Sequence, residues 1–196
     1  MKIYRYSMAS AEVYYHGTQN EFPFEAIRPS PNDVGIHFGN FRQAKWRVEH
    51  QNRVDRHTDY SQKVPPGSKI FEVYLDVNNP LEMPDLGNWN QPDMVAEELY
   101  KMGEFTLEEA KSVRTGQDIA RILKESGYDS IAYENYIEGT VGGFRREPSG
   151  WSIIVFSPSQ IKSYRVHSVW GNPDEYGYTQ PKKTKDKFVD FGKPVT

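Results

Sequence analysis

Residues 14–18 read YYHGT, and this stretch decides how the rest of the chain is interpreted. The wider segment 12–18, EVYYHGT, combines aromatic and β-branched residues and runs into a glycine, which predicts a short strand. A glycine at a strand end lets a ligand approach the backbone closely, so the peptide N–H and C=O of Gly17 could pair with an amide. The neighbouring ring of His16 could donate a hydrogen bond to a hydroxyl group. Alone, the pattern equally describes a satisfied histidine before a turn glycine.

A second short strand is predicted at residues 35–39, GIHFG, which lies between two glycines. Asn40 follows it, with Gln43 three residues later, and this pair predicts a helix N-cap with its capping-box partner. A helix that begins directly after a strand presents free N–H donors, which suit an anionic ligand. Arg42 in the first turn could assist, although a basic residue on a helix is as well explained by a solvated face.

The remaining pattern places helices between groups of strands. Further strands are predicted at 69–77, 129–135 and 151–157, with an edge strand at 163–169. Helices are predicted at 92–102, from Thr106 with its capping partner Glu109, and at 116–126, ending at Gly127. This order predicts an α+β domain built on a mixed or antiparallel sheet. We expect it to cover residues 1–168, with 169–196 as a polar, partly basic tail or peripheral arm.

Composition narrows the classes of function. The 196 residues include no cysteine, which excludes disulfides, thiolate nucleophiles and zinc–thiolate centres. The five histidines lack the tight spacing of a zinc site, so no metal is expected. Net charge is −3, which gives no global attraction to nucleic acid or anionic lipid. Residues 1–10 lack the apolar core of a signal peptide and no stretch is long enough to span a membrane. We therefore expect a cytoplasmic protein, in the producing cell or in a target cell.

The ordered set of three motifs carries a resemblance. YYHGT is followed about twenty residues later by GIHFGNFRQA, and the third motif, GYDSIAYEN with IIVFSPSQIKS, closes the domain. Together they resemble the ADP-ribosyltransferase superfamily, most closely its branch in polyvalent proteins of phages and mobile elements. The sequence is similar at greater distance to poly(ADP-ribose) polymerase catalytic domains. The resemblance implies a split β-sandwich, with helices between the strands of its two sheets, that holds NAD⁺ and cleaves its nicotinamide–ribose bond.

The resemblance also implies roles for individual residues. The first-strand histidine of the family contacts a ribose hydroxyl of NAD⁺ and the next glycine pairs through its backbone with the nicotinamide amide, so these roles fall on His16 and Gly17. The second-strand motif usually reads G-I-Y-F, and His37 stands here at the tyrosine that lines the nicotinamide pocket. Trp46 could supply stacking, although a tryptophan on a helix is often a core residue. The NAD⁺-binding candidates are His16, Gly17, Thr18, Gly35, His37, Phe38, Arg42 and Trp46.

The catalytic carboxylate departs from the family pattern. Many members carry a glutamate just before the last core strand, and alignment of IIVFSPSQI to that strand places Ser152 there. Glu134, Glu138 and Glu147 are available as replacements. We favour Glu134, because pairing of 129–135 with 151–157 as a hairpin would bring it near Ser152. The catalytic candidates are therefore Glu134, His16 and His37.

These observations predict a monomeric mono-ADP-ribosyltransferase, a glycosyltransferase that acts without metal. It would use NAD⁺ as co-substrate and modify a macromolecule, a protein rather than a nucleic acid, as a phage or bacterial effector. Its transition state would resemble an oxocarbenium ion, which a carboxylate stabilises. Two alternatives stay open. The chain could be a module of the same fold that binds NAD⁺, ADP-ribose or a partner without turnover, or a structural phage protein.

Overall fold

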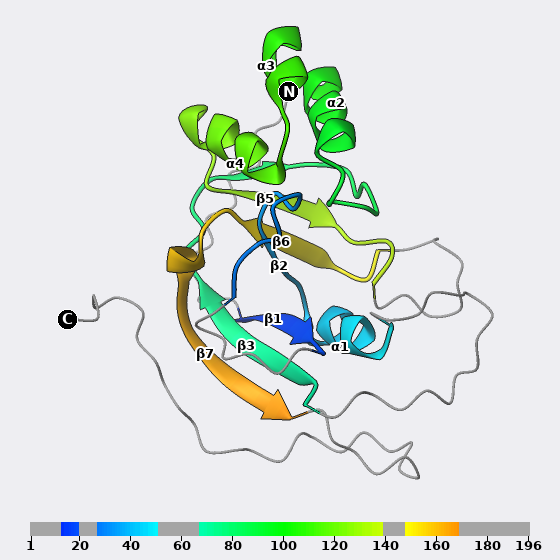
Figure 1. The fold of residues 1–196 in the computed structure, drawn as a ribbon. Coiled ribbons are helices and arrows are strands. Elements are labelled where there is room, and N and C mark those ends of the chain that lie inside the picture. Colours follow the sequence, from blue (N-terminus) through cyan, green and yellow to red (C-terminus); the bar gives the residue numbers. More distant parts are fainter. Residues whose placement is uncertain (1–12, 20–26, 51–66, 139–147, 169–196) are drawn as a thin grey trace.

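The structure is a computed structural model that describes residues 13–19, 27–50, 67–138 and 148–168 (Figure 1). Its strands are β1 (Val13–Thr18), β2 (Ile36–Phe38), β3 (Lys69–Leu75), β4 (Pro80–Glu82), β5 (Ser130–Glu134), β6 (Trp151–Val155) and β7 (Ile161–Ser168). The α-helices of this part are α1 (Phe41–His50), α2 (Pro92–Met102), α3 (Leu107–Ser112) and α4 (Gly116–Glu125), and a 3₁₀ helix covers Pro158–Gln160. The predicted tail, residues 169–196, lies outside the described residues.

The strands form two sheets. The three-stranded sheet has the order β1-β3-β7 and is antiparallel throughout. The four-stranded sheet has the order β2-β6-β5-β4, with β4 parallel to β5 and the other neighbours antiparallel. The prediction of a mixed α and β architecture is therefore confirmed, and the edge strand predicted at 163–169 corresponds to β7. Two sheets with four helices are compatible with the fold that the resemblance implies.

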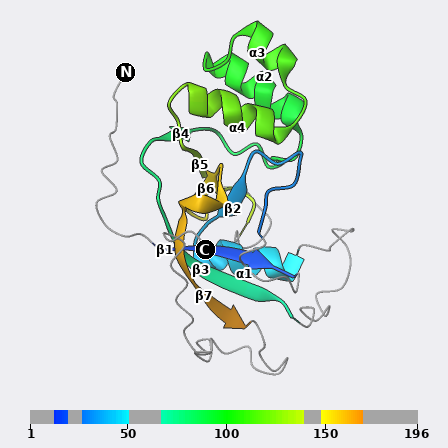
Figure 2. The same ribbon diagram turned by 60° about the vertical axis from the view of Figure 1, so that its left-hand side comes forward.

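One buried cluster joins the two sheets. Phe71 and Val73 of β3 belong to the same cluster as Phe38 of β2 and Ile153 and Val155 of β6, and each is at most 2% exposed. Figure 2 shows the two groups of strands one above the other. Full burial of side chains of this size stabilises the fold by about 1.5–3 kcal/mol each. This apolar contact therefore fixes how the first and second strands, with their candidate residues, lie relative to each other.

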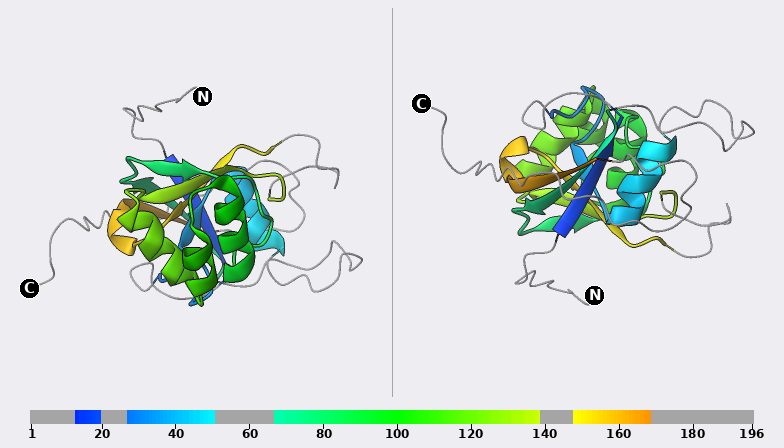
Figure 3. Two further views of the ribbon diagram at one scale, coloured as in Figure 1. Left: turned by 90° about the horizontal axis from the view of Figure 1, so that it is seen from above. Right: turned by 90° about the horizontal axis from the view of Figure 1, so that it is seen from below.

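Helices α2, α3 and α4 lie over the opposite face of the four-stranded sheet (Figures 1 and 3). Leu99 of α2 and Leu123 of α4 are fully buried with Ile131 of β5 and Ile154 of β6. Ile154 points to this layer while its neighbours Ile153 and Val155 point to the other sheet, as the alternation of a strand requires. The central strands are buried on both faces, which explains their continuous apolar runs.

Helix α1 packs on the β1 end of the three-stranded sheet. Ala44 and Val48 form a small buried cluster with Ile70 of β3. A Cβ atom on Gly17 would lie 2.1 Å from the carbonyl oxygen of Ala44, so only glycine allows this approach. The glycine is thus required by packing of the helix, a reason that the sequence pattern did not suggest.

The predicted helix ends are confirmed. The backbone N–H of Gln43 donates to Oδ1 of Asn40 at 3.0 Å, and the N–H of Asn40 donates to Oε1 of Gln43 at 2.7 Å. Thr106 and Glu109 form the second capping box. Gly127, with φ of 94°, follows α4 in the left-handed conformation that glycine adopts most easily.

Candidate active site

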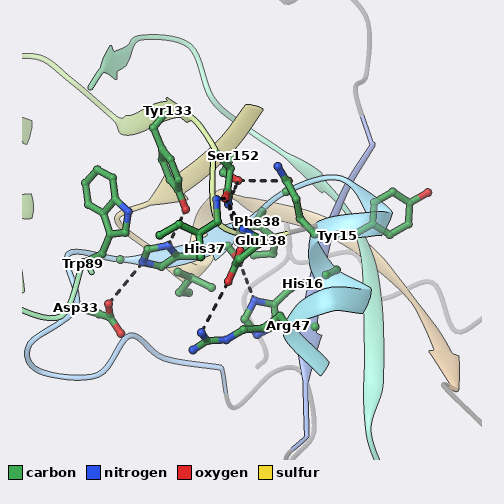
Figure 4. Close-up of a pocket in the computed structure, with 18 of the residues that line it drawn as sticks. Tyr15, His16, Asp33, His37, Phe38, Arg47, Trp89, Tyr133, Glu138 and Ser152 are labelled. Atoms are coloured by element: carbon green, nitrogen blue, oxygen red, sulfur yellow. Dashed lines mark hydrogen bonds and ion pairs between the residues drawn. The ribbon is translucent and has the colours of Figure 1, made fainter. Parts of the chain in front are cut away.

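A cavity of about 520 Å³ opens between the two sheets (Figure 4). Its walls come from the end of β1, the segment 27–35, β2, α1, the loop between β4 and α2, the end of β5 with the turn that follows it, and the start of β6. Beside it, Tyr15 of β1 and Gly39 after β2 exchange two backbone hydrogen bonds of 2.7 and 2.9 Å. The cavity therefore lies where the first strands of the two sheets meet.

The backbone of Gly17 faces this cavity. The N–H and C=O of Tyr15 point to Gly39 and hence away from β3. In an antiparallel pair these directions alternate from residue to residue, so Gly17 directs its N–H and C=O to the same outer edge of β1. Gly17 also lines the cavity. The placement thus supports a backbone donor and acceptor side by side for an amide.

The ring of His16 is oriented by the second strand. Its Nδ1 lies 2.8 Å from the carbonyl oxygen of His37. A carbonyl can only accept, so Nδ1 carries the proton, and in the neutral ring Nε2 is an acceptor. Burial lowers the pKa of His16 to about 4, although the hydrogen bond to His37 opposes the shift. At neutral pH Nε2 of His16 is therefore available as a hydrogen-bond acceptor, whereas the sequence pattern predicted that this ring donates to a hydroxyl.

His37 lies between a carboxylate and a phenol, as Figure 4 shows. Its Nε2 is 3.5 Å from Oδ1 of Asp33 and its Nδ1 is 3.4 Å from the hydroxyl of Tyr133 on β5. Burial raises the pKa of Asp33, but the hydrogen bond and charge of His37 outweigh burial, so the net shift is downward. Burial also raises the pKa of Tyr133, which stays a neutral phenol. Tyr133 thus brings a phenol beside His37 from another strand.

Ser152, which the sequence resemblance aligns with the family glutamate, is 2% exposed. Its Oγ donates to Oε1 of Gln43 at 3.3 Å and accepts from Nδ2 of Asn135 at 3.1 Å. Gln43 and Asn135 are themselves buried. The position is filled by a neutral, hydrogen-bonded network that ties α1 to β6, so it has no room for an ionised group without a partner.

The predicted carboxylate, Glu134, is not brought into the cavity. The predicted hairpin does form, but its register pairs Glu134 with Trp151 and Tyr133 with Ser152. Adjacent residues of a strand point to opposite faces, so Tyr133 lines the cavity and Glu134 faces away from it. The carboxylate of Glu134 instead accepts a hydrogen bond of 3.1 Å from the hydroxyl of Tyr136. The sequence argument identified the hairpin but not this one-residue offset.

Glu138, the second of the three carboxylates considered, lines the cavity. The amide of Asn135 donates to its Oε2 at 3.2 Å, and the Asn135 Oδ1 accepts from the backbone N–H of Glu138 at 2.8 Å. Arg47 of α1 lies 3.7 Å from its Oε1. The side chain of Asn135 therefore holds both the backbone and the carboxylate of Glu138 in place. Glu147, the third, lies outside the described residues.

The other predicted residues divide between cavity and surface. Thr18, Gly35, Phe38 and Trp46 line the cavity, with Trp46 half-buried, whereas Arg42 lies on the exposed side of α1 away from it. Among the residues that the structure describes, the arginines that line the cavity are instead Arg28 and Arg47. Other lining residues that the sequence did not single out are Asp33, Asp85, Trp89, Tyr133 and Asn135. The helical periodicity of α1 could have distinguished the two arginines. A helix turns about 100° per residue, so Arg42 and Arg47 lie on different sides of α1.

The cavity is a cleft lined by the His16 ring, which can accept a hydrogen bond, by the exposed backbone edge of Gly17, and by the Glu138 carboxylate, which Asn135 holds in place. Such a cleft suits a ligand with both a sugar and an amide. The model of the family described as ADP-ribosyltransferase in polyvalent proteins matches residues 10–169, and the chain belongs to this family. No curated protein and no solved structure matched the chain. ADP-ribosyltransferases use NAD⁺ as their substrate.

Within the described part of the chain, no three His, Asp or Glu side chains gather as a metal-binding group. None of its helices has the length and apolar character needed to cross a membrane.

Proposed function

We propose that this domain is a mono-ADP-ribosyltransferase with Glu138 as its catalytic carboxylate. The observation that carries the proposal is the position of Glu138 in the same cavity as His16 and Gly17, fixed by Asn135. In this arrangement His16 accepts a hydrogen bond from a ribose hydroxyl of NAD⁺, and the backbone of Gly17 pairs with the nicotinamide carboxamide. The family membership supports both contacts.

The chemistry needs few groups. The bond between the ribose carbon and the nicotinamide nitrogen breaks, and its electron pair neutralises the pyridinium, so the leaving group needs no proton. The developing positive charge on the ribose is stabilised by the Glu138 carboxylate. The same carboxylate takes the proton that the acceptor loses as it bonds to the ribose. His37 contacts the nicotinamide half from the second strand.

Arg47 and Arg28 are proposed to contact the diphosphate of NAD⁺. Both line the cavity and both are exposed, so their guanidinium groups can reach a solvent-facing anion. We propose these two arginines in place of Arg42, which is exposed and is not among the residues that line the cavity. Arg47 also contacts Glu138 at 3.7 Å, and a bound diphosphate would compete for that contact.

The acceptor is proposed to be a protein. The net charge of −3 gives no general attraction to nucleic acid, whose binding depends strongly on basic groups. The domain is proposed to act as a monomer, as an effector of a phage or bacterium in the cytoplasm of the producing or target cell. Modification of protein or RNA can be compared directly by incubating each with labelled NAD⁺.

The test uses two glutamates four residues apart. Glu138→Gln should lower nicotinamide release from NAD⁺ by roughly 100- to 10,000-fold, the usual effect of removing an acid–base group. Glu134→Gln is the matched control and should leave release unchanged, because Glu134 faces away from the cavity. Loss of nicotinamide release in Glu134→Gln but not in Glu138→Gln would restore Glu134 as the catalytic residue. Release at the wild-type rate in both variants would exclude both glutamates.

A binding module without turnover is the second candidate, and the neutral Ser152 network favours it. It predicts that the wild-type domain binds NAD⁺ in calorimetry yet releases no nicotinamide with any acceptor fraction. Under that outcome Glu138→Gln would alter affinity only.

A further inference from the structure

The indole of Trp89 carries a buried hydrogen-bond donor without a protein partner. Trp89 lies in the loop between β4 and α2 and is 6% exposed. Among the described residues, no acceptor is within hydrogen-bonding geometry of its Nε1–H. An unpaired buried donor costs about 1–3 kcal/mol, so such groups are few in native proteins and often mark a function.

Trp89 is part of a compartment made of three rings. Its ring centroid is 4.8 Å from that of Tyr133 and 6.2 Å from that of His37. Figure 4 shows the three side chains on one wall of the cavity, and all three line it. Nδ1 of His37 lies 3.4 Å from the Tyr133 hydroxyl and its Nε2 lies 3.5 Å from the Asp33 carboxylate, and Nε2, like the indole nitrogen of Trp89, has no hydrogen-bond partner among the described residues. The indole N–H therefore needs an acceptor that these neighbours do not supply.

The compartment adjoins the contact assigned to ribose. The His16 ring, which is proposed to contact the ribose, donates a hydrogen bond to the backbone carbonyl of His37. Because the side chain of His37 is one of the three rings, the ribose contact and the ring compartment are neighbours. A group bonded directly to that ribose can reach the compartment, whereas adenine is separated from it by a diphosphate and a second ribose. Aromatic walls with one donor suit a flat ring that carries an acceptor.

We propose that Trp89 recognises the leaving group of the dinucleotide, donating its Nε1–H to the carboxamide oxygen of nicotinamide. The inference rests on the proposed function and adds to it a specificity residue outside the three sequence motifs. The carboxamide oxygen has two lone pairs, so a hydrogen bond from Trp89 leaves one lone pair for a second donor. The unpaired donor is then a recognition group whose partner is the substrate.

The central experiment replaces Trp89 by Phe, which keeps an aromatic ring and removes the N–H. We expect nicotinamide and NAD⁺ to bind about tenfold more weakly, as the loss of one ordinary hydrogen bond implies. The wild type should prefer NAD⁺ to its thionicotinamide analogue, whose sulfur is a weaker acceptor, and Trp89→Phe should lose part of that preference. Trp151→Phe is the matched control, because Trp151 is 37% exposed and outside the cavity lining.

Stability supplies an independent readout. Because Nε1–H has no partner among the described residues, Trp89→Phe should melt at the wild-type temperature or slightly above it. A loss of stability by the equivalent of a hydrogen bond would overturn the premise that the donor is unpaired. If the variant does not fold, the wild-type protein provides the test. The NMR signal of its Trp89 indole N–H proton should shift downfield on addition of nicotinamide.

The outcomes separate this inference from the proposed function. Wild-type protein that binds neither NAD⁺ nor nicotinamide overturns both. Wild-type binding with unchanged affinity and unchanged thio-analogue preference in Trp89→Phe overturns the role of Trp89 alone, as does an unshifted indole proton.

Discussion

Lowering the pH from 7 to 5 should destabilise this domain through His16. The unfolded chain binds the imidazole proton at an ordinary pKa of 6.5, whereas the folded pKa is about 4, because burial opposes the charge. Between these values the unfolded state holds more protons, so stability is full above pH 6.5 and decreases as the pH falls towards 4. The shift is equivalent to roughly 3 kcal/mol at its limit, of which about 2 kcal/mol is lost by pH 5.

The assay is urea unfolding of the wild type and of His16→Gln at pH 7, 6 and 5. Glutamine can still donate to the His37 carbonyl but does not titrate, so the variant should show a change smaller by about 2 kcal/mol between pH 7 and 5. Asp33, whose pKa is lowered, contributes stability that is lost only as the pH falls below the ordinary Asp value, which separates the two windows. Equal pH dependence in both proteins would refute the burial of a neutral His16.

Three further substitutions test the fold around the site. Gly17→Ala should cost about 2 kcal/mol or more in denaturant unfolding, because its Cβ would lie 2.1 Å from the Ala44 carbonyl oxygen; an unchanged midpoint would contradict this packing. Ser152→Glu should not restore the family acid but lower stability by roughly 3 kcal/mol or more, since the site is buried and neutral; a stable, more active variant would show the opposite. Thr115→Ala removes the N-cap bond to the Asp118 backbone and should cost about 1 kcal/mol while NAD⁺ affinity, measured by calorimetry, stays unchanged.

Local signals predicted much of the fold. The capping boxes at Asn40 and Thr106, the glycine after α4 and the hairpin of β5 with β6 were all readable from short stretches. Each depends on backbone chemistry within a few residues, which neighbouring residue types specify. The sequence likewise placed His16 and Gly17 near the end of one strand, and both line the cavity.

The choice of carboxylate could not be read in this way. Glu134 and Glu138 are both close to the end of β5. The strand register directs Glu134 away from the cavity, whereas the turn held by Asn135 directs Glu138 into it. The place of Trp89 in the cavity could not be predicted from the sequence, for a different reason. It lies in a loop far along the chain from both glycine motifs, and nothing in that loop marks contact with His37.

The sequence by itself thus determined the elements, the family resemblance and the segment proposed to contact the ribose and the amide, because these depend on spacing along one strand or helix. The tertiary structure alone decided that Glu138, Arg28, Arg47 and Trp89 line the same cavity. Those residues come from separate elements, and their meeting depends on how two sheets and a helix pack, which is a property of the whole buried core rather than of any one stretch.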